Sequence, residues 1–136
     1  MLEQNKALIR RFYAEVVNGR KDELIDEMIA EDFDDHDARD KGREHFKTLY
    51  HVMIRIFPDI QASLQDLIAE GDEVVARVEF TATQADSFRG FPATNRQITY
   101  SGMDIFRIKD GKLTERWAQR DFLGMLERLG HISRTG

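Results

Sequence analysis

The spacing of apolar residues changes once along the chain, at Pro58. Before this residue, apolar positions recur every three or four residues, as they do on amphipathic helices. We expect these helices over residues 8–17, 24–29 and 46–57. After Pro58, apolar and polar residues alternate over 60–64 and 76–80, which is typical of strands with one buried face. Because the helices precede the strands instead of alternating with them, the pattern predicts an α+β fold.

The strongest turn signal is Asp110-Gly111, which separates two strand-like runs over 100–109 and 112–121. Side chains on a strand alternate between its two faces. One face of the second run should therefore carry Leu113, Glu115, Trp117, Gln119 and Asp121. That face would combine an aromatic ring with a carboxylate at the end of the strand. Such a pair suits a pocket in which an apolar wall excludes water and an acid transfers protons.

Two further segments complete the expected chain. Residues 84–97 contain Gly90, Pro92 and Asn95 and predict a long connection of the kind that forms the rim or lid of a binding site. Residues 122–129 have helical spacing and predict a short closing helix. A chain of 136 residues should form one domain, over 1–136. Four long antiparallel strands with few helices must curl, so we expect a curved sheet wrapped with the N-terminal helices into a cone with one mouth.

Composition excludes several classes of function. The chain has no cysteine, which rules out disulfides, thiolate nucleophiles and sulfur-based zinc sites. Its formal net charge is -5 and its basic residues are dispersed, which argues against a nucleic-acid partner. Apolar runs are too short for a membrane span and no leader-like segment opens the sequence, so we expect a cytoplasmic protein. Serine-hydrolase, phosphate-loop and dinucleotide motifs are not found.

A set of short motifs occurs in a particular order along nearly the whole chain. They are Phe12-Tyr13, Asn18, Phe33, His36, 66–72, Phe88-x-Gly90-x-Pro92, and 110–121 followed by Leu129-Gly130. In this order and spacing they resemble the SnoaL-like polyketide cyclases of the nuclear transport factor 2-like superfamily. The superfamily hosts isomerases, dehydratases, epoxide hydrolases, cyclases and non-catalytic binding proteins, so the resemblance is more specific for fold than for function.

The resemblance implies a cystatin-like α+β barrel that binds a small apolar molecule. It also implies a homodimer packed through the outer face of the sheet, with no cofactor and no metal. In the cyclases, an aspartate at the end of the last strand is the general acid and base in an intramolecular aldol closure of a polyketide ester. Asp121 lies at the matching position, which makes it the expected catalytic residue.

Asp121 also has a structural interpretation. An aspartate directly before an apolar helical run is a good helix N-cap. If its carboxylate bonded the amide of Leu123 or Gly124 and faced solvent, the catalytic assignment would not hold. If it lined the cavity beside Trp117, it could exchange protons with a carbon acid.

His36 is the second expected catalytic residue, since the family places a histidine at this loop. Its alternative is a solvated position among the neighbouring aspartates. A metal site is not expected, because the spacings of His36, His45 and His51 differ from those of helical metal-binding pairs. The aspartates around His36 also miss the calcium-loop pattern.

Four more residues are expected to bind substrate. Trp117, Tyr13 and Met103 should line an apolar cavity, although each could equally belong to the core. Gln84 stands where many relatives have the histidine of a Gly-Thr-His motif, and this chain reads Ala82-Thr83-Gln84. Glutamine can hydrogen-bond a substrate oxygen but cannot titrate near neutral pH, so a second histidine base is missing.

Other functions of the superfamily remain open at this point. Arg77 and Glu79 share one strand face and, with Asp121, resemble the acid–arginine–acid set of the epoxide hydrolases. An isomerase-like enzyme is a related alternative. A binding module that performs no chemistry would need only an apolar cavity. A collapsed cone filled by bulky side chains would leave a domain that only dimerises.

Overall fold

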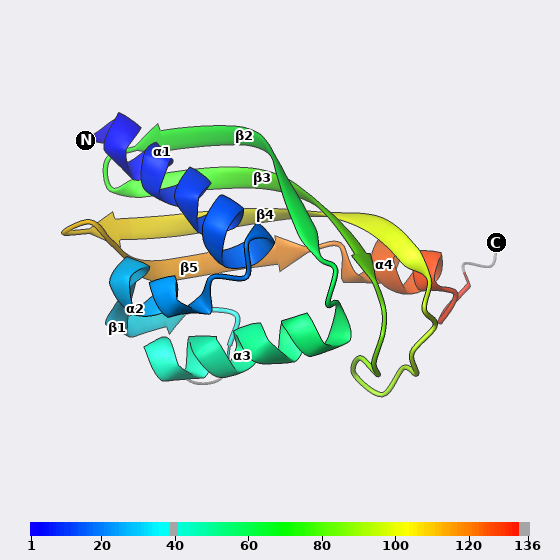
Figure 1. The fold of residues 1–136 in the computed structure, drawn as a ribbon. Coiled ribbons are helices and arrows are strands. Elements are labelled where there is room, and N and C mark those ends of the chain that lie inside the picture. The colour runs from blue at the N-terminus through cyan, green and yellow to red at the C-terminus, as the bar shows by residue number, and fades with distance from the viewer. Residues whose placement is uncertain (39–40, 134–136) are drawn as a thin grey trace.

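The computed structural model describes residues 1–38 and 41–133. Helical segments are α1 (Leu2–Arg11), η1 (Phe12–Asn18), η2 (Asp22–Leu24), α2 (Ile25–Met28), α3 (Arg43–Ile56) and α4 (Phe122–Leu129). Strands are β1 (Ile29–Asp35), β2 (Gln61–Glu70), β3 (Glu73–Thr83), β4 (Gln97–Lys109) and β5 (Lys112–Arg120). Figure 1 shows α1 crossing in front of the curved sheet and α3 beside the β1 edge. The expected α+β class is confirmed.

The strands lie in the order β1-β5-β4-β3-β2. All neighbours are antiparallel except β1, which runs parallel to β5. The sheet is curved and does not close on itself, so one concave face remains to be covered. The N-terminal helices and α3 cover it, and the main hydrophobic core lies between them and the sheet.

The N-terminal helix ends at Asn18, as its sequence predicts. Its last two turns, η1, are a wider π-helix that buries Phe12, Tyr13, Val16 and Val17. Asn18 then fastens the helix to the sheet, because its side-chain amide donates to the Ala62 carbonyl at 2.9 Å and accepts from the Ala62 amide at 2.6 Å. Since π-helical turns are rare and often occur at functional sites, this packing draws attention to the side chains that η1 presents.

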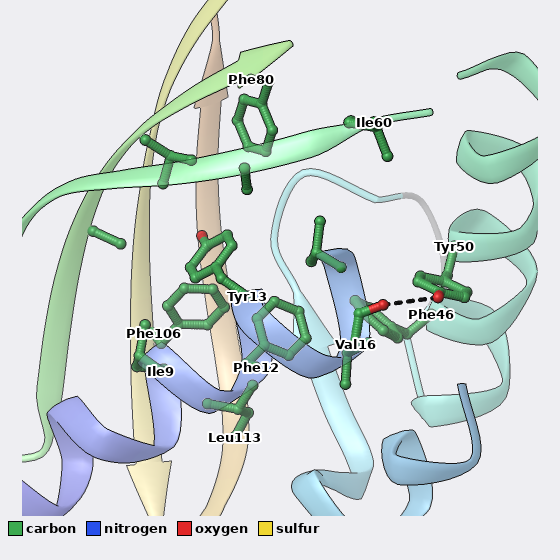
Figure 2. Close-up of a cluster of buried hydrophobic side chains, with 14 of the residues drawn as sticks. Ile9, Phe12, Tyr13, Val16, Phe46, Tyr50, Ile60, Phe80, Phe106 and Leu113 are labelled. Atoms are coloured by element: carbon green, nitrogen blue, oxygen red, sulfur yellow. Dashed lines mark hydrogen bonds between the residues drawn. The ribbon is translucent and has the colours of Figure 1, made fainter. Parts of the chain in front are cut away.

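Aromatic side chains bring the helices and the sheet together. Figure 2 shows Phe12 and Tyr13 facing Phe106 of β4, and the ring centroid of Phe106 lies 5.6 Å from that of Phe12. The Tyr50 hydroxyl from α3 donates to the Val16 carbonyl at 2.8 Å (Figure 2). Large aromatic surfaces dominate the energetics of such cores, and this hydrogen bond satisfies the polar end of a buried ring.

The expected second helix is wrong at its C-terminal end. Ile29 begins strand β1, and only residues 22–28 are helical, as a 3-10 turn followed by one α-helical turn. The sheet therefore has five strands where four long ones were expected. Strand β1 is short and rich in acids, and it buries Ile29, Phe33 and Asp35. Pairing with β5 overrides its low strand propensity, as tertiary context often does.

The β4–β5 hairpin turns at Asp110 and Gly111, both with positive φ (52° and 75°), as the sequence predicts. One extra residue in β5 then shifts the register: Ile108 pairs with Leu113, whereas Arg107 pairs with Glu115. This β-bulge at Thr114 moves all later side chains of β5 by one position. Leu113 is fully buried on the concave face, but Glu115 does not share that face with it.

The remaining expected segments are present. The 84–97 connection is bridged within itself at Phe88 and Phe91, and helix α4 ends at Gly130 in the left-handed conformation (φ 85°). No helix within 1–38 or 41–133 is both long enough and apolar enough to span a bilayer.

Candidate functional site

A cavity of about 490 Å³ lies between the concave face of the sheet and the covering helices. Its wall is mostly apolar and rich in aromatic rings, with phenylalanines from η1, α3, β3, the 84–97 connection and α4. The aromatic part includes Phe12, Phe46, Phe57, Phe80, Phe88 and Phe122. A cavity of this size with a few polar groups is typical of small-molecule sites, so the collapsed cone does not describe this chain.

The first polar cluster centres on Asp104 of β4, whose side chain is buried. Arg120 of β5 donates from Nη1 to Asp104 Oδ1 at 2.5 Å and from Nη2 to Oδ2 at 3.2 Å. The Tyr13 hydroxyl also donates to Oδ2. Both carboxylate oxygens therefore have partners, which a buried charge requires to be stable.

Tyr13 remains protonated in this cluster. Burial raises the pKa of the Tyr13 hydroxyl well above its usual value, and the neighbouring negative charge of Asp104 raises it further. The phenol consequently acts as a fixed hydrogen-bond donor at neutral pH. The expectation that Tyr13 lines the cavity agrees with its position.

Gly102 makes room for Arg120. The two residues are paired across β4 and β5, and a Cβ atom on Gly102 would lie 2.9 Å from both Cδ and Nη1 of Arg120. The guanidinium can therefore fold flat over the strand, where it also lies 4.7 Å from the Phe80 ring centroid. A glycine here permits the close approach that the ion pair needs.

The second polar cluster joins Asp35 at the end of β1 to Arg116 of β5. Arg116 Nη2 donates to Asp35 Oδ2 at 2.5 Å, and the guanidinium lies 5.4 Å from the Phe46 ring centroid. Among the described residues, two buried atoms of this pair have no hydrogen-bond partner: Oδ1 of Asp35 and Nε of Arg116. Buried polar atoms are seldom left without a partner, so this pair is less completely hydrogen-bonded than the Asp104–Arg120 pair.

Tyr100 adds a hydroxyl to the wall. Its ring stacks on Phe80 with centroids 5.2 Å apart. Burial raises the pKa of Tyr100 to about 12, so the hydroxyl is protonated at neutral pH. Within the part of the chain that the structure describes, this hydroxyl makes no hydrogen bond, and it is free to donate to a bound molecule.

Asp121 does not line this cavity, which corrects the expectation from the sequence. Its Oδ1 accepts a hydrogen bond from the Gly124 amide at 2.9 Å, so it is the N-cap of α4. Its Oδ2 lies 3.6 Å from Arg128 Nη1, and the side chain is 40% exposed. The Thr114 bulge explains the difference, because it places Arg120 and not Asp121 on the concave face.

Trp117 and Met103 lie on the opposite face of the sheet, again contrary to expectation. Both line a shallow groove of about 650 Å³ on the convex side, and Met103 is 55% exposed. Trp117 pairs with Ile105, whereas its neighbours Arg116 and Ala118 point to the cavity. The same one-residue shift explains Trp117, whereas Met103 lies in the exposed phase of β4, between Gly102 and Asp104.

His36 is not among the residues that line the cavity. Its ring stacks on Trp117, with centroids 4.4 Å apart and planes inclined by 7°. Ligand atoms of Asp34, His36 and Glu115 lie within 4.8 Å of one another. The two carboxylates already have cationic partners, because Asp34 lies 3.3 Å from Lys41 and Glu115 lies 2.6 Å from Arg107. The cluster is an ion-pair network at the surface of the sheet.

Gln84 is fully buried but holds the chain instead of lining the cavity. Its side-chain amide donates to the carbonyls of Asp86 at 3.0 Å and Phe91 at 3.2 Å. Its Oε1 lies 2.8 Å from Nε2 of His131. Gln84 therefore fixes the 84–97 connection against the end of α4.

The acid–arginine–acid set expected for an epoxide hydrolase is not assembled in the cavity. Arg77 pairs with Asp66 at 2.6 Å, and both side chains are about half exposed. Arg77, Glu79 and Asp121 all border the convex groove. Arg77 and Glu79 occupy alternate positions of β3 and point outward, as charged side chains in such patterns often do.

Sequence reasoning missed the two ion pairs of the cavity, Asp35–Arg116 and Asp104–Arg120. A signal for Asp104 was present. Tyr100, Gly102, Asp104, Phe106 and Ile108 alternate along β4, and all but Asp104 are apolar or small, so an acid occupies a core position of the strand. A charge in the buried phase of a strand indicates a paired or functional group. The arginines of β5 could not be found in this way, because the bulge hides their phase.

The sequence matches the family model of the SnoaL-like polyketide cyclases over residues 7–129. No curated protein matches the sequence.

Solved structures similar to this chain agree with the family. TsrD from Streptomyces laurentii is 27% identical with a TM-score of 0.87, covering 96% of this chain and 97% of its own. IdmH from Streptomyces antibioticus, a candidate polyketide cyclase, is 29% identical with a TM-score of 0.83, covering 93% and 99%. A candidate polyketide cyclase from Bacillus cereus is 34% identical with a TM-score of 0.78, covering 96% and 83%.

These similarities support a cyclase-like role. The curved sheet, the helices that cover it and the family match over most of the sequence agree with one another. The chain therefore belongs to the SnoaL-like polyketide cyclase family.

Proposed function

We propose that this chain catalyses an intramolecular aldol-type ring closure of an apolar compound that carries several carbonyl groups. The observation that carries the proposal is the Asp35–Arg116 pair, which lines a largely apolar cavity and has a single hydrogen bond to its carboxylate. A carboxylate with so few hydrogen-bond donors is an acceptor for a substrate proton, and the adjacent guanidinium can donate to a substrate oxygen.

In this proposal Asp35 is the general base. Its carboxylate takes a proton from a carbon that lies between two carbonyl groups, and the electrons of the broken C–H bond form an enolate. The Arg116 guanidinium and the Tyr100 hydroxyl, which also line the cavity, stabilise negative charge on the enolate oxygen in this proposal. The enolate carbon then bonds to a second carbonyl carbon of the same molecule. The new alkoxide recovers the proton from Asp35, so the step balances with no redox partner.

Asp104 is a weaker candidate for the base. Both of its oxygens accept hydrogen bonds, from Arg120 and from Tyr13. Removing a proton from substrate would require breaking one of these bonds in a buried environment, where unpaired groups are costly. Asp104 is better suited to holding Arg120 and Tyr13 in place at the cavity wall.

Proton abstraction can be tested with a substitute substrate. An aromatic 1,3-diketone in deuterated buffer exchanges the hydrogens of its central carbon, and NMR follows the rate. We expect the wild-type protein to accelerate the exchange and Asp35→Asn to lower that acceleration by about 100-fold or more, the usual contribution of a general base. Asp121→Asn is the matched control, and it should exchange at the wild-type rate.

Three results would count against the assignment. Full exchange in Asp35→Asn would remove Asp35 as the base, and loss of exchange in Asp121→Asn would restore the role first expected for Asp121. A wild-type protein that binds the diketone without accelerating exchange would favour a non-catalytic binding module. Calorimetric binding of the diketone to each variant shows whether the cavity has stayed intact.

We further propose that two copies of the chain pack through the convex face of the sheet. Exposed Met103 and Ile68 lie on this side, and Trp117 and Ile105 border the same groove. A second copy would cover this apolar surface. Light scattering should give a dimer, and Met103→Glu should weaken it. A monomeric wild-type protein at micromolar concentration would contradict this proposal.

A further inference from the structure

The mouth of the cavity carries a third arginine, which the proposed reaction does not use. Arg89 lies in the 84–97 connection and lines the cavity together with Phe88 and Phe122. Its guanidinium carbon is 4.6 Å from the centroid of Phe122 and 5.4 Å from that of Phe88. Two aromatic rings therefore hold the cation at the mouth.

Unlike the other two arginines of the cavity, Arg89 has no acidic partner. Within the described residues, its guanidinium makes no ion pair and no hydrogen bond, whereas Arg116 and Arg120 pair with Asp35 and Asp104. The acid of its own loop, Asp86, lies 3.0 Å from Arg55 instead. The in-plane N–H groups of Arg89 remain available because its contacts with Phe88 and Phe122 are made through the ring faces.

The backbone at Arg89 is also unusual. Phe88 and Phe91 exchange two hydrogen bonds of 2.8 Å, and the two residues between them, Arg89 and Gly90, have positive φ angles of 49° and 85°. Such a tight turn favours asparagine, aspartate or glycine at its first central position. A long side chain in this conformation costs free energy. Such strained backbone conformations often occur at residues that serve a function.

The rest of the connection keeps this turn in place. Buried Gln84 bonds to the carbonyls of Asp86 and Phe91 on either side of it, and Phe91 also contacts the His131 ring with centroids 4.9 Å apart. The Arg89 guanidinium thus lies on a turn that these contacts fix in position.

We infer that Arg89 binds a carboxylate of the substrate, so that the natural substrate is a carboxylic acid and not a neutral ester. This inference rests on the proposed function, because it assumes that the substrate occupies the cavity. A guanidinium presents paired N–H donors that match the two oxygens of a carboxylate, and the cavity behind Arg89 accommodates the apolar body of the molecule. Asp37, the other charged group outside the two ion pairs, accepts the Ala118 amide and has the wrong sign to bind an anion.

The experiment compares two probes of the same shape, anthraquinone-2-carboxylate and its methyl ester, by calorimetric titration. Wild-type protein should bind the acid about tenfold more tightly than the ester, the difference expected for one charge-assisted contact. Arg89→Gln should bind both probes equally, and Arg89→Lys should keep part of the preference. Arg10→Gln removes the same charge from an exposed position outside the cavity and should keep the whole preference.

A preference that survives in Arg89→Gln, or that Arg10→Gln abolishes equally, would overturn the inference, as would equal affinity of the two probes for the wild-type protein. The binding measurement needs no turnover, which separates this inference from the proposed function. If the wild-type protein fails to accelerate proton exchange but prefers the acid through Arg89, the catalytic proposal fails and this one stands. If the wild-type protein accelerates proton exchange but does not prefer the acid, the catalytic proposal stands and this inference fails.

Discussion

Two carboxylate–guanidinium pairs line the same cavity and differ in one respect. Asp104 has three hydrogen bonds from two partners, whereas Asp35 has one and keeps a buried oxygen without a partner. Both pairs bridge neighbouring strands and both guanidiniums lie over phenylalanine rings. The comparison indicates that a satisfied pair contributes structure, and that an incomplete pair is the better place to look for chemistry.

The two pairs should differ most in how much stability is lost when the acid is removed, and the loss should be larger for the Asp104–Arg120 pair. Asp104→Ala leaves Arg120 buried without its counter-charge, and we expect the free energy of unfolding to fall by about 3–5 kcal/mol. Urea denaturation followed by circular dichroism measures the change. Asp35→Ala should cost less, because Asp35 has only one partner to lose. Equal losses in the two variants would show that the pairs are energetically alike.

Alkaline pH should lower the free energy of unfolding through the buried hydroxyl of Tyr100. Burial raises the pKa of Tyr100 to about 12, above its usual value of 10.0, so the folded chain retains a proton that the unfolded chain releases. The resulting stability is present below pH 10 and is lost as pH rises towards 12. For a shift of this size the loss is about 3 kcal/mol. Tyr100→Phe should flatten the fall in unfolding free energy over this range, and an unchanged pH profile would contradict the burial of the hydroxyl.

Tyr13→Phe should affect the satisfied pair and leave the incomplete pair intact. Loss of the phenol removes one hydrogen bond to the charged Asp104 and should lower the free energy of unfolding by about 1.5–3 kcal/mol. Diketone exchange should continue at a rate close to that of the wild-type protein, since Asp35 and Arg116 are untouched. A loss of exchange as large as that in Asp35→Asn would place Tyr13 in the reaction and merge the two clusters.

Asp121→Ala should have the smallest effect. It removes the N-cap of α4, which typically costs about 1 kcal/mol. Thermal unfolding measures this loss, and Asp121→Ser, which retains a capping oxygen, should restore most of it. If serine fails to restore stability, the capping bond is not the main contribution of this side chain.

The sequence was sufficient for the fold because the change of period at Pro58 and the Asp110-Gly111 turn are local signals. Helix α3 ends at Ile56, just before Pro58, and the hairpin turns at Asp110 and Gly111, where these signals predict. Strand β1 was missed because its stability comes from pairing with β5, which is distant in sequence. Its one hint of a strand is that Phe33 and Asp35, two positions apart, are both buried and therefore share a face.

The site was predicted less well, and for Trp117 and Asp121 the physical reason involves one residue. Counting alternate positions from Leu113 assigned Trp117 and Asp121 to the pocket, but the bulge at Thr114 reverses the assignment from Glu115 onward. A bulge has little signature in a single sequence, since it depends on how two strands pair. Tyr13 lines the cavity as expected, although it lies in the π-helical turns of η1, because both it and Phe12 are buried against the sheet.

The extra residue in β5 also has a consequence for how this chain tolerates change. Deleting Thr114 would remove the bulge but leave Leu113 opposite Ile108 and Glu115 opposite Arg107, so the indole of Trp117 would stay on the convex face and both arginines on the concave face. A point replacement at the same position would leave that orientation alone. Removing one residue from 115–119 would instead turn the side chains before or after it to the opposite face, so β5 should tolerate the loss of Thr114 better than the loss of a residue that follows it.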